Sequence, residues 1–233
     1  MAKVAALIPA AGQGTRMGAK VNKQLLKLFG KPVLAYTLEV FQQCSLIDQI
    51  IVVAAKSEIP VIEREIVQAY HFTKVVGIVP GGEQRQDTVR KGLENMDSAV
   101  EWVVVHDGAR PLLLLAEVEN IVKRALAEGT AMIAAVPVKD TIKQVDSAGK
   151  IRVTLPRKTL WAAQTPQVFP KSLLIAAHRQ SVLDGISATD DAGLVEMTGV
   201  QVAVTMGSYE NIKITTPEDL DLALGILRRR NAG

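Results

Sequence analysis

Residues 6–24 read ALIPAAGQGTRMGAKVNKQ, a glycine-rich turn that directly follows an apolar segment. A turn of this kind exposes backbone N–H groups to an anion. Arg16 and Lys23 follow within a few residues. A guanidinium group can bind two phosphate oxygens at once, and an ammonium group acts as a mobile point charge. The segment therefore predicts a phosphate site, and phosphate chemistry on a nucleotide is the leading interpretation.

The spacing of the glycines argues against two common nucleotide-binding motifs. Gly12, Gly14 and Gly18 do not follow the GxGxxG pattern of a dinucleotide-binding turn. They also lack the Gly-Lys-Ser/Thr that ends a P-loop, and the GKP at residues 30–32 does not supply it. Neither a Rossmann dehydrogenase nor a P-loop nucleotide hydrolase is supported. A simple tight connection remains the alternative for the glycine turn by itself.

Asp107 is the strongest candidate for a metal ligand. It follows the apolar segment 102–106 and precedes the sequence GARP. A carboxylate at a strand end beside phosphate groups suits Mg²⁺, which prefers a few carboxylates plus substrate oxygens. The alternative is an aspartate that caps a loop. His106 alternates into the preceding strand, so we expect it to pack in the core rather than to act as a catalyst.

Further polar residues lie at the ends of predicted elements. Gly81-Gly82 opens a helix in the sequence PGGEQRQDTV, where backbone groups can read the edge of a base and glycine allows close approach. An ordinary helix start explains the same glycines. Other polar residues could together build a pocket for an anionic substrate, and these are Arg157, Lys213, Thr141, Thr165 and Thr189.

The elements that must position these residues alternate regularly in the first part of the chain. The predicted strands are 3–9, 49–55, 75–80, 102–106 and 131–136, and the predicted helices are 33–43, 60–70, 87–96 and 116–128. Near-continuous apolar strands between helices indicate a parallel sheet covered on both faces, an α/β fold. Ligands bind such sheets at the carboxyl ends of strands, where residues 10–15, 81–85, 107–110 and 139–141 fall.

The regular alternation then breaks. Residues 141–145 and 151–154 predict a β-hairpin around a glycine turn. A two-stranded hairpin is marginal alone, so it must dock on its own domain or on a second subunit, and the residues leave both open. Beyond it, the pattern predicts an extended segment, two helices, two strands and a last helix. The extended segment is 161–169, and the two helices are 170–183 and 190–197, the second with Thr189 as its cap. The two strands are 201–206 and 211–214, and the last helix starts at Thr216.

Composition limits the class of protein. With 233 residues and 48% hydrophobic residues, the chain can bury a large α/β core. The net charge of +3 is mild and aromatic residues make up 4%, which argues against a nucleic-acid partner. Cys44 is alone, so no disulfide or cysteine metal cluster is expected. No apolar run reaches membrane-spanning length, and we expect a cytoplasmic location with no membrane partner.

Short segments along nearly the full length of the chain together resemble one known protein family. The quoted segments are PAAGQGTRMG, Lys23-Gln24, PGGEQRQDTV, VHDGARP, PVKDTIK, QTPQ after Trp161, ATDD, NIKIT and TPEDL. In this order they resemble the 2-C-methyl-D-erythritol 4-phosphate cytidylyltransferase family. The resemblance implies a three-layer αβα nucleotidyltransferase fold, Rossmann-like with a mostly parallel sheet. It also implies a protruding β-hairpin arm that interlocks with a partner subunit, within one domain that spans residues 1–233.

The resemblance also implies ligands and site residues. The ligands are CTP, a sugar-alcohol phosphate and Mg²⁺, and the homodimer exchanges arms built from residues 138–160. Catalytic roles fall on Arg16, Lys23, Arg157 and Lys213, with Arg157 contributed across the dimer. CTP contacts fall on Pro9, Ala10, Ala11, Gly12, Gly14, Thr15, Gly82, Glu83 and Thr88. Acceptor contacts fall on Asp107, Arg110, Thr141, Thr165 and Thr189, and the metal-side carboxylate is Asp107.

The implied reaction joins CTP and methylerythritol phosphate and releases pyrophosphate, in non-mevalonate isoprenoid precursor biosynthesis. A phosphate oxygen attacks, and it is largely deprotonated at neutral pH, so no general base is required. The same chemistry with ribitol or ribulose 5-phosphate is the nearest alternative. A catalytically silent nucleotide-binding regulator is an alternative of another class, which the presence of Arg16, Lys23 and Asp107 disfavours.

Two residues depart from the family pattern. Asn22 stands where a proline usually precedes the catalytic lysine, and Gly108 stands where an alanine is common. Proline would stiffen the segment by fixing φ, so we expect asparagine to leave it looser. Glycine and alanine are both small, so we expect close approach of the substrate at residue 108 in either case.

Overall fold

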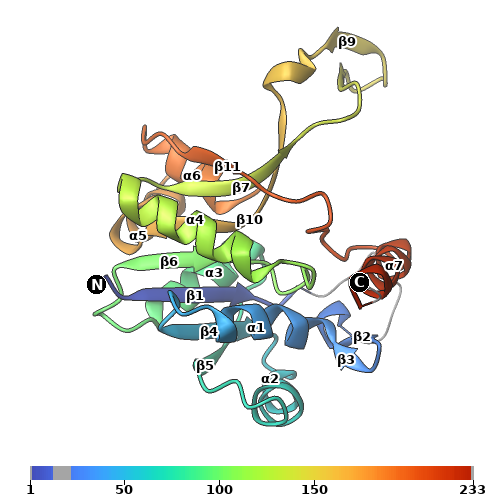
Figure 1. Ribbon diagram of the computed structural model, residues 1–233. Coiled ribbons are helices and arrows are strands. Elements are labelled where there is room, and N and C mark those ends of the chain that lie inside the picture. The colour runs from blue at the N-terminus through green and yellow to red at the C-terminus, as the bar shows by residue number, and fades with distance from the viewer. Residues whose placement is uncertain (1, 13–21, 232–233) are drawn as a thin grey trace.

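A seven-stranded sheet forms the centre of the protein in the computed structural model, which describes residues 2–12 and 22–231 (Figure 1). Its strands are β1 (Val4–Pro9), β4 (Gln49–Ala54), β5 (Val75–Pro80), β6 (Trp102–Val105), β7 (Met132–Pro137), β10 (Trp161–Pro170) and β11 (Ala203–Met206). They are ordered β11-β7-β10-β6-β1-β4-β5. Only β10 runs antiparallel to its neighbours in this sheet. The mostly parallel α/β fold expected from the sequence is confirmed.

Helices cover both faces of the sheet. The helices α1 (Val33–Gln43) and α4 (Leu115–Glu128) pack on one face, with α2 (Ile59–Ile62) and the π-helix η3 (Glu63–Gln68) near its edge. The other face carries α3 (Arg85–Glu94), α5 (Lys171–Leu183) and α6 (Asp191–Met197). In β1, Val4, Ala6 and Ile8 belong to the first core and Ala5 and Leu7 to the second. This two-residue alternation explains why the strands are apolar throughout.

The helix α3 lies unusually close to the sheet. A Cβ atom on Gly92 would meet Leu7 Cδ1 at 2.7 Å and Val53 Cγ2 at 2.8 Å. Glycine at this position therefore lets the helix backbone approach β1 and β4. Helix α3 begins at Arg85, shortly after β5 ends at the carboxyl edge of the sheet.

A third, smaller apolar cluster attaches the C-terminal helix α7 (Pro217–Asn231) to the body. Its buried residues are Leu28, Val33, Leu112, Ile214, Ala223, Ile226 and Leu227. Leu28 belongs to the short hairpin of β2 (Lys27–Leu28) and β3 (Lys31–Pro32), which the sequence did not predict. At the start of α7, Asp219 Oδ2 accepts hydrogen bonds from the backbone N–H groups of Thr215 and Thr216, both at 2.8 Å. Asp219 therefore caps the backbone at the entry to α7.

Two local predictions are wrong. Residues 211–214 form no strand, because the backbone of this segment bonds to a loop: Ile214 N–H donates to Ala109 O at 2.9 Å. The cap of α6 is Asp190 rather than Thr189, since Asp190 Oδ1 accepts from Gly193 N–H at 3.0 Å. This leaves Thr189 outside the helix.

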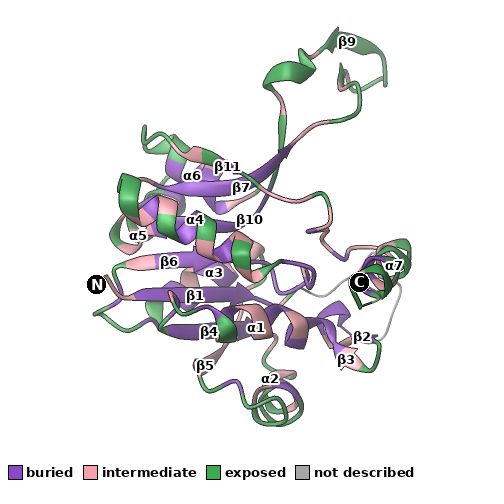
Figure 2. Ribbon diagram, viewed as in Figure 1, coloured by how far each residue is buried: buried purple, intermediate pink, exposed green. Residues whose placement is uncertain are grey.

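The arm, residues 138–160, projects from the body beyond β7 and β10 (Figure 1). It contains β8 (Lys143–Val145), β9 (Ile151–Thr154) and the 3₁₀ turn η4 (Arg157–Thr159). Every residue of its two strands is exposed, in contrast to the fully buried strands β1 and β4 at the centre of the main sheet (Figure 2). Val145, Ile151 and Val153 keep 52%, 63% and 43% of their surface exposed.

Among the residues that the structure describes, no helix combines the length and apolar character needed to cross a membrane.

Candidate active site

Two pockets meet at the carboxyl edge of the sheet. The first, here the glycine-side pocket, has a volume of about 330 Å³ and lies where β1, β5 and β6 end and α3 begins. It is lined by Pro9, Ala11, Gly12, Lys23, Gln24, Gly82, Glu83, Gln84, Arg85, Thr88, Asp107, Ala109 and Lys213. Three of the four strand ends that the sequence placed at one edge are therefore neighbours in space, whereas residues 139–141 line neither this pocket nor the second one.

Packing requires the glycine pair at the rim of this pocket. A Cβ atom on Gly81 would meet Ala11 Cβ at 2.4 Å, and one on Gly82 would meet Asp87 Cβ at 2.2 Å. The Thr88 hydroxyl holds the turn, since it accepts from Gly82 N–H at 3.2 Å and donates to Gln84 O at 3.0 Å. Glycine thus brings backbone to the pocket surface where a side chain would not fit.

The second pocket, here the threonine-side pocket, has a volume of about 240 Å³. It is lined by Arg85, Asp107, Arg110, Ala163, Gln164, Thr165, Gln167, Thr189, Asp190 and Lys213. It shares Arg85, Asp107 and Lys213 with the glycine-side pocket. Molecules bound in the two pockets would therefore meet at these three charged side chains.

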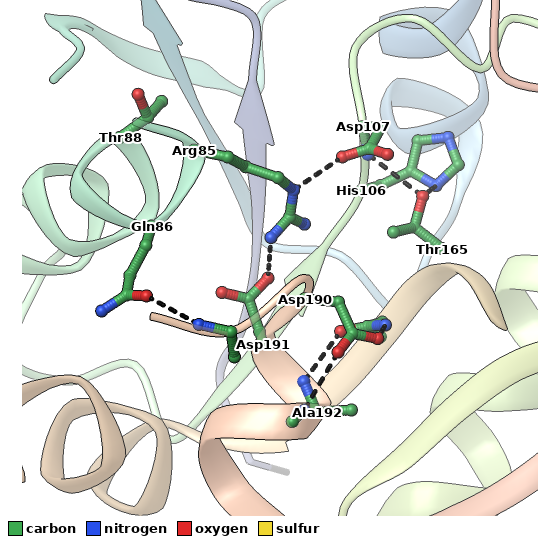
Figure 3. Close-up of polar contacts among 12 residues, drawn as sticks. Arg85, Gln86, Thr88, His106, Asp107, Thr165, Asp190, Asp191 and Ala192 are labelled. Carbon is green, nitrogen blue, oxygen red and sulfur yellow. Dashed lines mark hydrogen bonds and ion pairs between the residues drawn. The ribbon is translucent and has the colours of Figure 1, made fainter. Parts of the chain in front are cut away.

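Asp107 is the centre of this junction. Its Oδ1 lies 3.1 Å from Arg85 Nε (Figure 3). Its Oδ2 lies 2.8 Å from Lys213 Nζ and 3.7 Å from Arg110 Nε. Burial alone would raise the pKa of Asp107, but Arg85, Lys213 and Arg110 together hold that pKa well below its usual range. The carboxylate therefore stays ionised, and it keeps three cations at the junction of the pockets.

Arg85 connects Asp107 to a second buried carboxylate. Its Nη1 donates to Asp191 Oδ2 at 2.7 Å (Figure 3), and Asp191 Oδ1 accepts from His178 Nε2 at 3.1 Å. Burial favours the neutral form of Arg85, yet Asp191 and Asp107 raise its pKa above the usual value. Sequence reasoning assigned no role to Arg85 or Asp191. They lie within the quoted segments PGGEQRQDTV and ATDD, which was the available signal.

Hydrogen bonds fix the protonation pattern behind Asp107. The carbonyl oxygen of Arg110 lies 3.2 Å from His106 Nε2 and can only accept, so neutral His106 carries its proton on Nε2. Its Nδ1 therefore accepts from the Thr165 hydroxyl at 3.0 Å, while Thr165 Oγ1 accepts from Asp107 N–H at 3.1 Å (Figure 3). Burial lowers the pKa of His106 to about 4. His106 is thus a neutral core residue, as expected from the sequence.

Several predicted site residues lie elsewhere. Thr141 and Arg157 are exposed on the arm, and within the described chain they line neither pocket. Arg157 Nη1 donates to Lys139 O at 2.6 Å. Ala10 is fully buried and, unlike Pro9 and Ala11, does not line the glycine-side pocket. Gly14, Thr15 and Arg16 lie outside the described residues.

The donor set of the site suits a cation that arrives with its substrate. In the described ranges, no three His, Cys, Asp or Glu side chains gather as a metal cluster. Asp107 and Glu83 are the carboxylates among the residues that line the glycine-side pocket. Mg²⁺ commonly takes one or two carboxylates and fills its remaining positions with phosphate oxygens and water. The residues therefore fit Mg²⁺ bound mainly by a nucleotide, and they do not build a cage for a free ion.

Comparison with known proteins agrees with this geometry. Residues 4–229 match the family model described as IspD: 2-C-methyl-D-erythritol 4-phosphate cytidylyltransferase. A 2-C-methyl-D-erythritol 4-phosphate cytidylyltransferase from Geotalea uraniireducens is 48% identical over 232 residues, which are 99% of each chain. One from Syntrophotalea carbinolica is 50% identical over 222 residues, 95% of this chain and 94% of the relative.

Comparison with solved structures shows the same fold. A 4-diphosphocytidyl-2C-methyl-D-erythritol synthase from Anaerococcus prevotii superposes with a TM-score of 0.86 at 32% identity, covering 97% of this chain and 96% of that one. The match thus extends over nearly the whole of both chains. The chain belongs to the IspD family of 2-C-methyl-D-erythritol 4-phosphate cytidylyltransferases and is a nucleotidyltransferase.

Proposed function

We propose that this protein transfers CMP from CTP to 2-C-methyl-D-erythritol 4-phosphate, giving 4-diphosphocytidyl-2-C-methyl-D-erythritol and pyrophosphate in non-mevalonate isoprenoid precursor biosynthesis. The observation that carries the proposal is the pair of pockets that share Arg85, Asp107 and Lys213. A transferase for two anionic substrates needs such an arrangement, because both must be held close together while their repulsion is neutralised.

CTP would occupy the glycine-side pocket. Pro9, Ala11, Gly12 and the Gly82–Thr88 turn present backbone at its surface, which suits recognition of a base and ribose. Lys23 would stabilise the triphosphate charge from the same pocket. Arg16, Gly14 and Thr15 keep their proposed phosphate roles on sequence grounds, and so does Ala10 for the nucleotide.

The acceptor would occupy the threonine-side pocket. Lys213 and Arg110 would bind its phosphate, while Thr165, Thr189 and the Asp107 carboxylate would bond to its hydroxyl groups. A phosphate oxygen of the acceptor attacks the α-phosphorus of CTP, a new P–O bond forms, and the bond to pyrophosphate breaks in line. The attacking oxygen has already lost its proton at neutral pH, so the site needs positioning and positive charge rather than a base.

A divalent cation belongs to this proposal as a companion of the triphosphate. When bound, Mg²⁺ would neutralise charge on the phosphate oxygens. Asp107 is the carboxylate that would reach it, because it lies at the junction of the pockets. Arg85, Lys213 and Arg110 already pair with Asp107, so they hold the carboxylate ionised until the cation arrives.

We further propose a homodimer in which arms are exchanged. Thr141 and Arg157 would complete the acceptor pocket of the partner subunit, which accounts for their distance from both pockets of their own chain. The exposed apolar side chains of Val145, Ile151 and Val153 would be covered in the same contact. Residues 1–233 would form one domain, with residues 138–160 as the dimerisation arm, and the enzyme would act in the cytoplasm.

The test is pyrophosphate release in the presence of CTP, Mg²⁺ and one of three acceptors. We expect release with methylerythritol phosphate and little with ribitol or ribulose 5-phosphate. Preference for a pentose-derived phosphate would replace the substrate assignment. CTP binding without release with any acceptor would favour the silent regulator instead.

A further inference from the structure

Asn22 caps the short 3₁₀ turn η2 (Lys23–Leu25), whose first residue lines the glycine-side pocket. Asn22, Lys23 and Gln24 are 8%, 9% and 4% exposed. A buried polar side chain directly before a pocket residue requires bonding partners, since an unpaired buried amide is costly. The partners of Asn22 come from two distant parts of the chain.

The amide of Asn22 connects three backbone segments. Its Nδ2 donates to Glu58 Oε2 at 2.8 Å and approaches Ala10 O at 3.4 Å. Its Oδ1 accepts from Gln24 N–H at 3.4 Å. Ala10 follows β1, and Glu58 lies between β4 and α2. Asn22 therefore ties the start of the Lys23 turn to the carboxyl ends of two adjacent strands, in contrast to the looseness expected from the sequence.

The bond to Glu58 is the strongest of these contacts. It has the shortest distance and a charged acceptor, whereas the two contacts at 3.4 Å are long for hydrogen bonds. Glu58 is half-buried, and burial raises its pKa while the Asn22 bond opposes that rise. Each group therefore supplies a partner that the other needs.

The backbone of Asn22 has φ −60° and ψ 134°. This φ is the value that a proline ring imposes. We propose that Asn22, held by Glu58, is a positioning residue for the cytidylyl transfer: the Asn22–Glu58 clasp fixes the backbone from which Lys23 enters the pocket. The inference rests on the proposed function of Lys23. In it, the bonded side chains of Asn22 and Glu58 restrict the backbone at residue 22, as the ring of a proline would do covalently.

Two pairs of substitutions separate this role from a general loss of stability. Asn22→Ala and Glu58→Ala remove the clasp. Asn22→Pro restores the backbone restriction without the bond, and Glu58→Gln keeps an oxygen that accepts from Asn22 Nδ2. Asn95→Ala is the matched control, because it removes a hydrogen bond of 2.8 Å to Lys91 O at an exposed site.

The first measurement is steady-state kinetics of pyrophosphate release. Both alanine variants should lose about tenfold in kcat, while KM for CTP changes by less than about twofold, because misplacement of Lys23 acts mainly on the reacting geometry. Asn22→Pro, Glu58→Gln and Asn95→Ala should stay within about twofold of the unchanged protein. The double variant Asn22→Ala with Glu58→Ala should be no worse than either single variant, since both remove one bond.

The second measurement does not depend on activity. Acetylation of Lys23 by a lysine-reactive ester, followed by mass spectrometry, should be about fivefold faster in the two alanine variants and unchanged in the other three. If the unchanged protein releases no pyrophosphate while this labelling pattern appears, the proposed function fails and the clasp stands. Unaltered labelling in both alanine variants, or an equal rise in Asn22→Pro and Glu58→Gln, would overturn the clasp.

Discussion

The carboxyl edge of the central sheet and the arm carry proposed site residues in opposite physical settings. At the sheet edge, Asp107 and Arg85 are surrounded by charged partners from distant segments. On the arm, Arg157 is exposed and its described contact is to the nearby carbonyl of Lys139. The sheet edge is therefore organised by its own chain, whereas the arm presents functional groups and apolar surface outward.

The sheet edge and the arm illustrate two kinds of site, one made of buried paired charges and one made of exposed groups. Buried charges that neutralise one another fix geometry but make the fold depend on each partner. Exposed groups on a projecting hairpin contribute little to the stability of their own subunit, so they are free to serve another. Changes at the sheet edge should thus affect turnover and stability, and changes on the arm should affect assembly.

The largest effect is expected at Lys23. Lys23→Ala should lower turnover by about 10²–10³-fold, because it removes a positive charge from the proposed transition state. The melting temperature should change by only about 2–4 °C. Lys123→Ala on the exposed side of α4 is the control. Near-normal turnover of Lys23→Ala would contradict the site assignment.

The arm can be tested against the sheet edge by mixing subunits. Arg157→Ala and Lys23→Ala proteins should each be nearly inactive, yet a random mixture should recover about a quarter of normal activity. Half of its dimers are mixed, and each mixed dimer has one intact shared site. Mixed dimers that are proven by mass spectrometry but stay inactive would contradict a shared site.

Asp107→Asn should reduce stability as well as turnover. The substitution leaves the half-buried guanidinium of Arg85 with one carboxylate fewer, at an expected cost of about 2–3 kcal/mol in the free energy of unfolding. Asp146→Asn in the arm turn should cost less than about 1 kcal/mol, since Asp146 is half-buried and Asn can accept the same backbone bonds from Ala148 and Lys150. If urea denaturation showed equal losses of unfolding free energy for Asp107→Asn and Asp146→Asn, the sheet edge and the arm would not differ in their contribution to stability.

The pH dependence of stability should follow His106. Its pKa is about 4 when folded and about 6.5 when unfolded. As pH falls through this window the unfolded chain binds a proton and the folded protein does not, so stability decreases by about 1 kcal/mol per unit. His106→Phe should flatten this slope, whereas the arm has no histidine. Identical slopes in the two proteins would show that His106 is not the group responsible.

The smallest effect on stability is expected from the apolar arm residues. Ile151→Ser together with Val153→Ser should raise the dimer dissociation constant at least about tenfold, because both side chains would lose burial against a partner. The melting temperature of the body should stay within about 2 °C. Analytical ultracentrifugation measures the first quantity and calorimetry the second. An unchanged dissociation constant would place the dimer contact elsewhere.

Much of the fold could be predicted because each element carries its own pattern. Helix α1 and strand β5 begin and end at the predicted residues. The antiparallel direction of β10 was not predicted, since an apolar run does not encode which way a buried strand runs. The false strand at 211–214 has a similar origin: Ile212 and Ile214 alternate because they pack under α7 rather than in a sheet.

The site was predicted unevenly for a related reason. Asp107 and Lys213 stood out as charges at the ends of elements, and they lie 2.8 Å apart. Arg85 was missed because its role depends on burial between Asp107 and Asp191, which no local pattern reveals. The bonds of Asn22 to Ala10 and Glu58 were missed for the same reason, since they join segments that only the sheet brings together.

Under the proposed function, the two pockets hold the two substrates of one transfer. Its most direct test is ³¹P NMR of the purified protein with CTP, Mg²⁺ and methylerythritol phosphate. We expect the resonances of CTP and of the acceptor monophosphate to decrease together while a diphosphate diester and free pyrophosphate increase in equal amounts. Loss of CTP without the diester, or formation of the diester with a pentose-derived phosphate in preference, would contradict it.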